Sequence, residues 1–375
     1  MFKKIKIDKY LVFCLFIFFI ISIMSIYSAS MYLSKSLGNL VIKQSLWYIV
    51  GIVFIFIIMK FKIKIIYDYA WYIYLIHLVL LAGLLLIGPV INGSRCWYVI
   101  NGVGSFQPSE FMKISLILIL SKMIDSYKNN YKDLSILDEF KLICLILLIV
   151  LLPSVLTFLE PDTGAVLIYL IITFFTLFVS GIRMRWFVLL FIFIALFLSV
   201  FLSIYFFYGD LFIKLFGSNF FYRIDRIINW QSGSGMQLTN SLSAIGSSGL
   251  MGHGFNHTPI YFPEAGTDFI FSVFVSNFGF IGSMILLVIL LFFDLRLIYI
   301  SRSNINSIDK YVMIGVISIL LYQQIQNISM TIGLLPITGI TLPFISYGGS
   351  SLLSYLLMIG IIFNFSRENK EKYTL

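Results

Sequence analysis

Long apolar runs constrain this chain more than any other feature of its sequence. Each run is long enough to cross the hydrocarbon core of a bilayer as a helix. Of the 375 residues, 60% are hydrophobic and only 11% are charged, which excludes an ordinary soluble domain. We therefore expect an all-α polytopic membrane protein with ten transmembrane helices, forming a single domain over residues 1–375. The expected spans are about 10–30, 44–61, 70–91, 106–124, 140–159, 163–181, 186–208, 269–293, 311–333 and 346–365.

The basic residues alternate between successive loops. With the N-terminus inside, the inner segments hold 19 of the 26 lysines and arginines, the outer loops hold six, and Lys113 lies within a span. This bias is the topology signal of multi-pass membrane proteins, so we expect both termini in the cytoplasm and a cytoplasmic-membrane location. The same distribution accounts for the net charge of +9 without a nucleic-acid partner.

Several kinds of chemistry leave no trace in the sequence. There is no phosphate-binding loop of the GxxxxGK[ST] type and no HExxH metal motif. The cysteines and histidines have neither disulfide-like nor metal-like spacing. We expect no protein metal site and no disulfide among Cys14, Cys96, Cys144, His77, His253 and His257.

One outer loop, residues 209–267, is too long to be a simple connector. We expect a short amphipathic helix over residues 238–250, on the outer surface. A glycine-rich stretch follows from Gly246 to Gly254, and its glycines allow tight turns close to a ligand. A flexible linker has a similar composition, so that alternative stays open.

Asp268 stands where this polar loop meets the apolar run that begins at Phe269. A carboxylate at that depth is costly unless it faces a cavity or a partner, which makes it a functional candidate. The competing interpretation is that Thr267 and Asp268 cap the helix, since both residue types favour helix starts. Asp162 raises the same two possibilities at the start of the sixth span.

Other charged residues gather near the same plane. Glu110 and Lys113 are three residues apart inside the fourth span, so they can pair, either as a structural ion pair or as part of a site. Arginines suit phosphate groups, and an acid beside them suits general-base catalysis. A mixed-charge site facing outward indicates a phosphate-bearing lipid as the ligand. Its members are Arg95, Glu110, Lys113, Asp162, Arg223, Arg226 and Asp268.

Motifs along nearly the whole chain resemble the SEDS family (shape, elongation, division and sporulation), whose members include RodA and FtsW. The resemblance is carried, in order, by Phe106-Gln107-Pro108-Ser109-Glu110 with Lys113, Pro161-Asp162-x-Gly164, Tyr222-Arg223-x-x-Arg226, Gln237 to Ser241, Ala244-Ile245-Gly246, Pro263-Glu264 with Thr267-Asp268-Phe269-Ile270-Phe271, Asn327, Leu335 to Pro343 and Ser346 to Ser351.

The resemblance implies a peptidoglycan glycosyltransferase that polymerises lipid II at the outer face of the membrane. Asp268 matches the family's catalytic acid, and we expect it to be ionised. It also implies a single-span class B penicillin-binding protein transpeptidase as partner, and it is compatible with a divalent cation, Mg or Mn, on the diphosphate. The implied binding residues are Arg95, Lys113, Arg223, Arg226, Gln237 and Ser241, and the implied supporting residues are Glu110, Asp162, Glu264, Thr267, Asn327 and Ser346.

The sequence departs from the family pattern in places. Glu160 stands where glutamine is usual, and Gly246-Ser247-Ser248-Gly249 stands where Gly-Ser-Gly-Gly is commoner. The short cytoplasmic ends favour an elongation type, RodA-like, over a division or sporulation type. Two other functions remain as alternatives: a lipid II flippase, and a scaffold that only positions the transpeptidase.

Overall fold

A computed structural model describes residues 7–30, 40–91, 93–100, 104–130, 135–218, 221, 224, 235–303 and 306–372. The chain is mostly helical in these ranges. The elements are α1 (Lys9–Ser30), α2 (Leu40–Lys60), α3 (Ile63–Asp68), α4 (Ala70–Ile87), β1 (Tyr98–Ile100), β2 (Gly104–Phe106), α5 (Pro108–Asn130), α6 (Ile136–Leu159), α7 (Thr163–Val179), α8 (Met184–Phe207), α9 (Gly209–Phe216), α11 (Met236–Ser247), α12 (Ile270–Ser303), α13 (Ser307–Thr331) and α14 (Gly349–Lys372).

Seven described helices are long and apolar enough to cross a membrane: α1, α2, α4, α6, α8, α12 and α13. Two shorter apolar helices occupy the expected spans 163–181 and 346–365. Helix α5 occupies the range 106–124, but it carries five charged side chains from Glu110 to Lys128. The protein is therefore a multi-pass helical membrane protein, as predicted.

Local sequence signals set several helix boundaries. Pro108 opens α5, where its missing N–H costs nothing. Ser135 and Asp138 form a reciprocal capping box at the start of α6. Asp162 caps α7 by accepting a hydrogen bond from the Ala165 N–H at 3.0 Å. The capping interpretation of Asp162 is thus confirmed.

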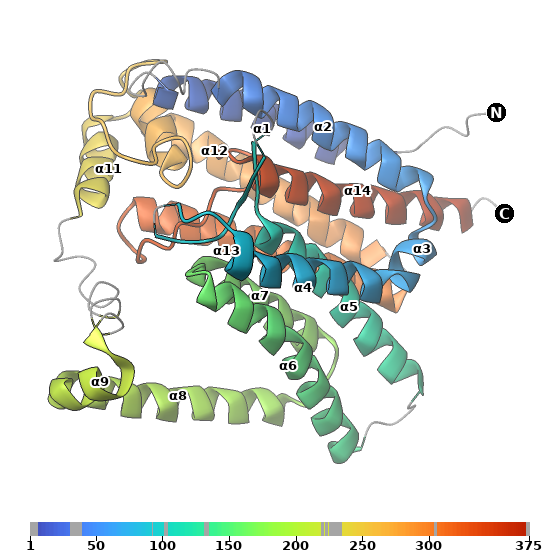
Figure 1. Cartoon of the computed structure of the whole chain (residues 1–375). Helices are drawn as coiled ribbons and strands as arrows, with labels where there is room; N and C mark the ends of the chain where they lie inside the picture. Colours follow the sequence, from blue (N-terminus) through green and yellow to red (C-terminus); the bar gives the residue numbers. More distant parts are fainter. Residues whose placement is uncertain are drawn as a thin grey trace.

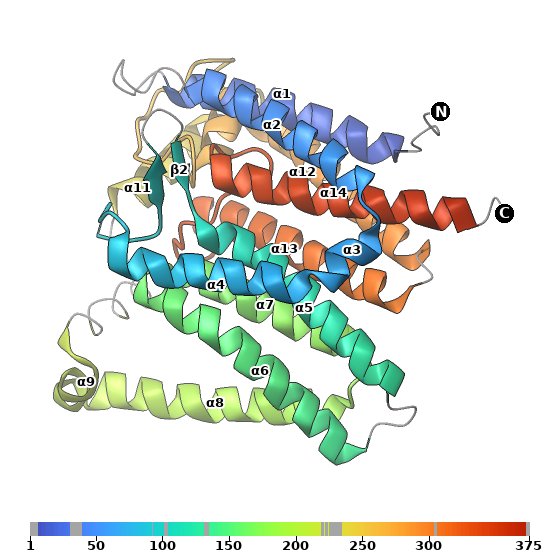
Figure 2. The same ribbon diagram turned by 45° about the vertical axis from the view of Figure 1, so that its right-hand side comes forward.

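Helix α13 lies at the centre of the bundle and packs against α5, α7 and α12, while α14 packs along α2 (Figure 1). Helix α1 begins and α14 ends at the same end of the bundle (Figure 2). Helix α8 stands apart from the rest in both views and buries only Phe187 and Tyr205. An apolar helix with so little protein around it is suited to contact with lipid.

Helix α12 is interrupted at Gly279, whose φ of 66° and ψ of −163° are not helical. The glycine-rich end of the long loop fills the interruption. Phe280 N donates to Gly249 O at 3.0 Å, Ile281 N to Leu250 O at 3.1 Å, and His253 N to Ser276 O at 2.9 Å. The helix break therefore leaves these backbone groups paired, as membrane depth requires.

At Gly252 the loop backbone comes close to another backbone segment of the protein, and not to a ligand as expected. A Cβ on Gly252 would lie 2.3 Å from Asn277 O, and a Cβ on Gly279 would lie 2.3 Å from Gly252 N. The glycines let two backbone segments of the protein meet. The stretch is consequently a docked segment and not a flexible linker.

The segment between α13 and α14 is also non-helical, and side chains pair its backbone. Gln326 Nε2 donates to Pro336 O at 3.0 Å, and Ser22 Oγ donates to Ile345 O at 2.8 Å. Gln44 Nε2 donates to Ser346 O at 3.1 Å. Helices α1, α2 and α13 together hold this irregular segment in place.

Two further elements bear on the sequence predictions. The helix expected over residues 238–250 is confirmed as α11, and its buried side chains Leu238, Ser241 and Ala244 lie on the face it turns to the protein. The antiparallel hairpin of β1 and β2 pairs Tyr98 with Phe106 and was not predicted. Cys14, Cys96 and Cys144 are free thiols, as expected.

Replacing Gly279 by alanine should destabilise the protein by about 2–4 kcal/mol, because the new Cβ meets backbone atoms and the left-handed φ is strained. Thermal unfolding in detergent would measure the loss. Gly246→Ala is the matched control, since Gly246 is helical and nothing lies within 4 Å of its Cβ position. Equal stability of the two variants would contradict the proposed backbone contact.

Candidate active site

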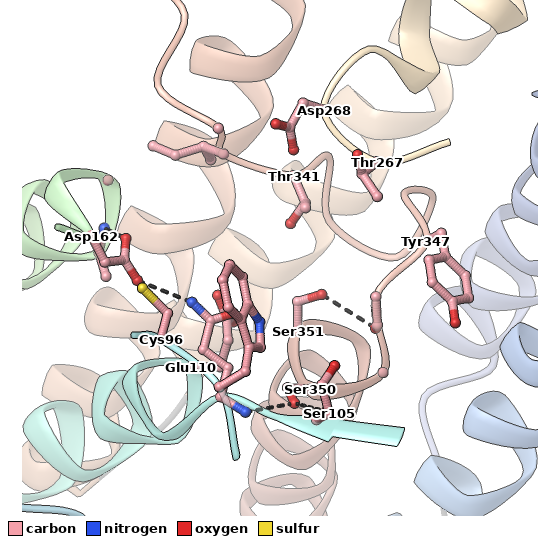
Figure 3. Close-up of a pocket in the computed structure, with 18 of the residues that line it drawn as sticks. Cys96, Ser105, Glu110, Asp162, Thr267, Asp268, Thr341, Tyr347, Ser350 and Ser351 are labelled. Carbon is pink, nitrogen blue, oxygen red and sulfur yellow. Dashed lines mark hydrogen bonds between the residues drawn. The ribbon is translucent and has the colours of Figure 1, made fainter. Parts of the chain in front are cut away.

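A cavity of about 770 Å³ opens at the end of the bundle where α5, α7 and α14 begin. Its polar lining comes from segments far apart in the sequence. Figure 3 shows Asp268, Thr267 and Thr341 on one side, Asp162 and Cys96 on another, and Ser350 and Ser105 on a third. The lining includes Lys43, Trp47, Cys96, Ser105, Gln107, Glu110, Asp162, Gln237, Glu264, Thr267, Asp268, Gln323, Thr338, Gly339, Thr341, Tyr347, Gly348, Gly349, Ser350 and Ser351.

The backbone around Asp268 is held from two sides. Asn327 Nδ2 donates to Asp268 O and to Ile340 O, both at 2.8 Å. Ser346 Oγ donates to Thr267 O at 2.6 Å and accepts from Leu342 N at 2.9 Å. These contacts fix Asp268 against the segment between α13 and α14, so its carboxylate has a defined position in the cavity.

The Asp268 carboxylate has no hydrogen-bond partner among the described residues, so the structure gives no support to the interpretation that it caps α12. Burial, together with the charge of Glu264, raises its pKa to about 7. We expected the helix start to keep this group ionised, but burial outweighs that effect. A carboxylate with a pKa near neutrality is well matched to general-base catalysis.

Glu264 is the second carboxylate on this side of the cavity. Its Oε2 accepts a hydrogen bond from Thr267 Oγ1 at 2.7 Å. Its backbone φ of 56° lies in the left-handed region, which is uncommon for a residue other than glycine. The turn therefore holds a negative charge close to Asp268.

Asp162 and Glu110 lie on the opposite side. Asp162 Oδ2 accepts from Gln107 Nε2 at 3.0 Å and from Ser109 Oγ at 3.1 Å, and burial raises the pKa of its carboxyl. Glu110 Oε2 pairs with Lys113 Nζ at 2.5 Å, as the i,i+3 spacing predicted. Lys113 is fully buried and is not part of the cavity lining, so its charge is committed to Glu110.

Glu160, two residues before Asp162 in the chain, is a carboxylic acid in a buried environment that disfavours its ionised form. It is fully buried, and neither carboxylate oxygen has a partner within the described part of the chain. Burial and the nearby charge of Asp162 raise its pKa to about 8. The group is therefore mostly protonated at neutral pH, close to the glutamine that is usual in the family.

Replacing Glu160 by glutamine should raise stability, and more so at alkaline pH. The raised pKa of the folded protein means that ionised Glu160 opposes folding, so the wild type loses stability as pH rises from about 4.5 towards 8. Thermal unfolding at about pH 6 and pH 9 should show a gap between the proteins that widens with pH. A gap of constant size would contradict the assignment.

Of the other predicted site residues, one lines the cavity, two lie away from it, and two are outside the described residues. Gln237 lines the cavity from the first turn of α11. Ser241 lies away from it, with its hydroxyl 2.6 Å from Ser272 Oγ and donating to Thr331 O. Arg95 is exposed, and its guanidinium donates to Leu85 O near the end of α4. Arg223 and Arg226 lie outside the described residues, so their roles stay predictions.

Sequence reasoning missed several lining residues. Lys43 is the one lysine or arginine among the lining residues that the structure describes. Trp47 packs so closely on α14 that a Cβ on Gly349 would lie 2.6 Å from its ring. Gln323 is buried in the wall. A polar amide inside an apolar span was the available signal for Gln323, whereas nothing local marked Lys43 or Trp47.

The residues present do not form a ready metal site. Within the described ranges, no group of three or more histidine, cysteine, aspartate or glutamate side chains is placed to hold a metal ion. The divalent cation considered for the diphosphate therefore has no protein cage there.

Comparison with known proteins identifies the family. The family model described as "Cell cycle protein" for FtsW, RodA and SpoVE matches residues 8–371. The chain is 33% identical to a probable peptidoglycan glycosyltransferase FtsW of Coxiella burnetii, covering 97% of both chains. It is 31% identical to the peptidoglycan glycosyltransferase MrdB of Helicobacter pylori, covering 88% of this chain and 84% of that one.

Solved structures agree in fold. One, described as a peptidoglycan synthase complex that coordinates polymerization and crosslinking, superposes with a TM-score of 0.80 at 26% identity, covering 97% of this chain and 98% of that one. The rod shape determining protein RodA of Thermus thermophilus superposes with a TM-score of 0.70 at 25% identity, covering 98% of both. The fold and cavity are those of a multi-pass membrane protein with a polar site. The chain belongs to the FtsW/RodA/SpoVE family.

Proposed function

We propose that this protein is a peptidoglycan glycosyltransferase that polymerises lipid II, with Asp268 as its general base. The observation that carries the proposal is the position of Asp268. Its carboxylate lies in a large polar cavity, is free of hydrogen bonds from the described residues, and has a pKa of about 7. Family membership and relatives named as peptidoglycan glycosyltransferases support the same activity.

We take the reaction to be the one that the family resemblance implies, with Asp268 placed to act as its base. Asp268 removes the proton from the 4-hydroxyl of the acceptor sugar as that oxygen attacks C1 of the donor sugar. The new C1–O4 bond forms while the bond from C1 to the diphosphate oxygen breaks, and undecaprenyl diphosphate leaves with the electron pair. Four carboxylates line the cavity, so the diphosphate is best placed near Lys43, the one lysine or arginine among the described lining residues.

The membrane arrangement belongs to this proposal. Ten spans with both termini in the cytoplasm put the cavity at the outer face of the cytoplasmic membrane, where lipid II is polymerised. The common end of α1 and α14 supports this orientation. A class B penicillin-binding protein is the proposed partner, and similarity to a chain of a peptidoglycan synthase complex supports it. We retain the elongation type as the working assignment.

Asp268→Asn should reduce lipid II polymerisation by about 10²–10⁴-fold, the range for loss of a general base. The assay uses purified full-length protein and purified lipid II, alone and with the cognate transpeptidase. The variant should be folded and at least as stable as the wild type, because it removes a buried carboxylate with a raised pKa.

The same assay separates the rival functions. Full activity of Asp268→Asn would remove the catalytic assignment. No polymer from the wild type, even with the transpeptidase present, would instead favour a flippase or a scaffold, and a lipid-flipping assay would then distinguish those two.

Glu264→Gln should shift the acid limb of the pH–rate profile to lower pH. Asp268 must be deprotonated to act, and loss of the neighbouring negative charge lowers its pKa. At about pH 6 the variant should therefore keep a larger fraction of its own maximal rate than the wild type keeps. An unchanged limb would show that Glu264 does not act on Asp268. Glutamine preserves an acceptor for the Thr267 hydroxyl.

A further inference from the structure

The cavity wall contains two buried polar atoms that no described residue satisfies. They are Gln323 Oε1 and Thr338 Oγ1, and both residues line the cavity. Gln323 is only 1% exposed. A buried acceptor without a partner opposes folding, so its presence in a cavity wall indicates a ligand that supplies the missing hydrogen bond.

These two atoms belong to the same part of the cavity as Asp268. Gln323 and Asn327 are four residues apart on α13 and share one face, and Asn327 holds the Asp268 backbone. Thr338 directly precedes Gly339. A Cβ on Gly339 would lie only 3.6 Å from Asp268 Oδ2.

The two unsatisfied atoms are neutral, and the other charged groups near them belong to the protein's own pairs and caps. Thr338 O would lie 3.1 Å from a Cβ on Gly164, two residues after Asp162, and the Glu110–Lys113 pair lies beside Tyr355. Thr341 lies near Asp268 in the cavity (Figure 3), and its hydroxyl is 3.2 Å from the Tyr355 hydroxyl. The Asp268 carboxylate repels an anionic diphosphate, whereas the amide and the hydroxyls carry no charge. They match the hydroxyl and acetamido groups of a neutral sugar, which both donate and accept hydrogen bonds.

We propose that Gln323 and Thr338 form the binding subsite for the acceptor sugar and hold its reacting hydroxyl at Asp268. This inference rests on the proposed function. Gln323 and Thr338 are specificity residues, because they hydrogen-bond groups of the sugar that do not react. A sugar without matching hydrogen-bonding groups would leave Gln323 Oε1 and Thr338 Oγ1 without partners, so the site would discriminate against it.

The test compares Gln323→Met and Thr338→Val with the wild type. Both replacements keep the shape and remove the hydrogen-bonding group. The matched control is Gln324→Met, one position away on α13, where the buried amide Nε2 donates to Asp294 Oδ1 at 3.2 Å and does not line the cavity. Steady-state polymerisation of lipid II by the full chain with its transpeptidase gives KM and kcat, and thermal unfolding gives stability.

We expect Gln323→Met and Thr338→Val each to raise the KM for lipid II by about 10- to 100-fold, the usual loss for a buried hydrogen bond to a substrate. The thermal stability of Thr338→Val should be unchanged or higher, because an unsatisfied buried atom has been removed. Any loss in Gln323→Met should stay below that of Gln324→Met, because Gln323→Met removes the unsatisfied Oε1 together with the contact of the amide with Tyr355. Gln324→Met should behave in the opposite way, with lower stability and a KM within about twofold of the wild type.

Two results would overturn the subsite. One is a wild-type KM in both variants. The other is a loss of activity accompanied by a loss of stability as large as that of Gln324→Met, which would indicate a structural role.

Failure of the proposed function gives a different result, because the wild type would then make no polymer. In that case, the subsite is tested by the increase in the melting temperature of the protein when lipid II binds. A rise in melting temperature that is smaller in Gln323→Met than in the wild type would sustain it, and an equal rise in both would exclude it.

Discussion

The structure depends on one constraint: a backbone N–H or C=O at membrane depth must find a partner within the protein. Two segments break helical continuity and meet this requirement in different ways. The interruption of α12 at Gly279 is filled by backbone groups of the glycine-rich loop. The irregular segment between α13 and α14 is paired mainly by side chains, among them Gln44 and Gln326. Both arrangements tie distant parts of the chain into one unit.

The candidate site depends on the side chains that hold the segment between α13 and α14. Asn327 Nδ2 donates to both Asp268 O and Ile340 O, so it ties Asp268, two residues before α12, to the segment before α14. A catalytic group needs this kind of rigid support, since small displacements lower the rate greatly. The same polar side chains therefore serve both the stability of an irregular backbone and the position of a carboxylate.

The acids around the cavity are held in distinct ways. Glu110 is neutralised by Lys113, and Asp162 accepts three hydrogen bonds, so both are occupied by the protein. Asp268 accepts no hydrogen bond from the residues that the structure describes, and its raised pKa places its protonation change near physiological pH. Glu160 is buried, its carboxylate oxygens have no partner in the described ranges, and it is best kept protonated. Environment, more than residue type, separates the acid that can react from those that support the wall.

The sequence by itself determined the membrane class and most of the helices, and it predicted Asp268 as a functional residue. Hydrophobic length and charge alternation are local properties, and so is the i,i+3 pairing of Glu110 with Lys113. The motifs of the family also pointed to the segments from Leu335 to Ser351 that line the cavity.

Only the tertiary structure decided which side chains share that cavity. Lys43, Trp47 and Gln323 come from helices that approach one another only after packing, and no spacing in the sequence records that approach. The same holds for the pKa of Asp268, because a helix start predicts an ionised acid while burial raises its pKa. The glycines of the loop indicated that its backbone could come close to a partner, and only the fold shows that Gly252 meets the backbone of α12. Long-range packing supplied each of these answers, since burial and proximity are properties of the assembled fold.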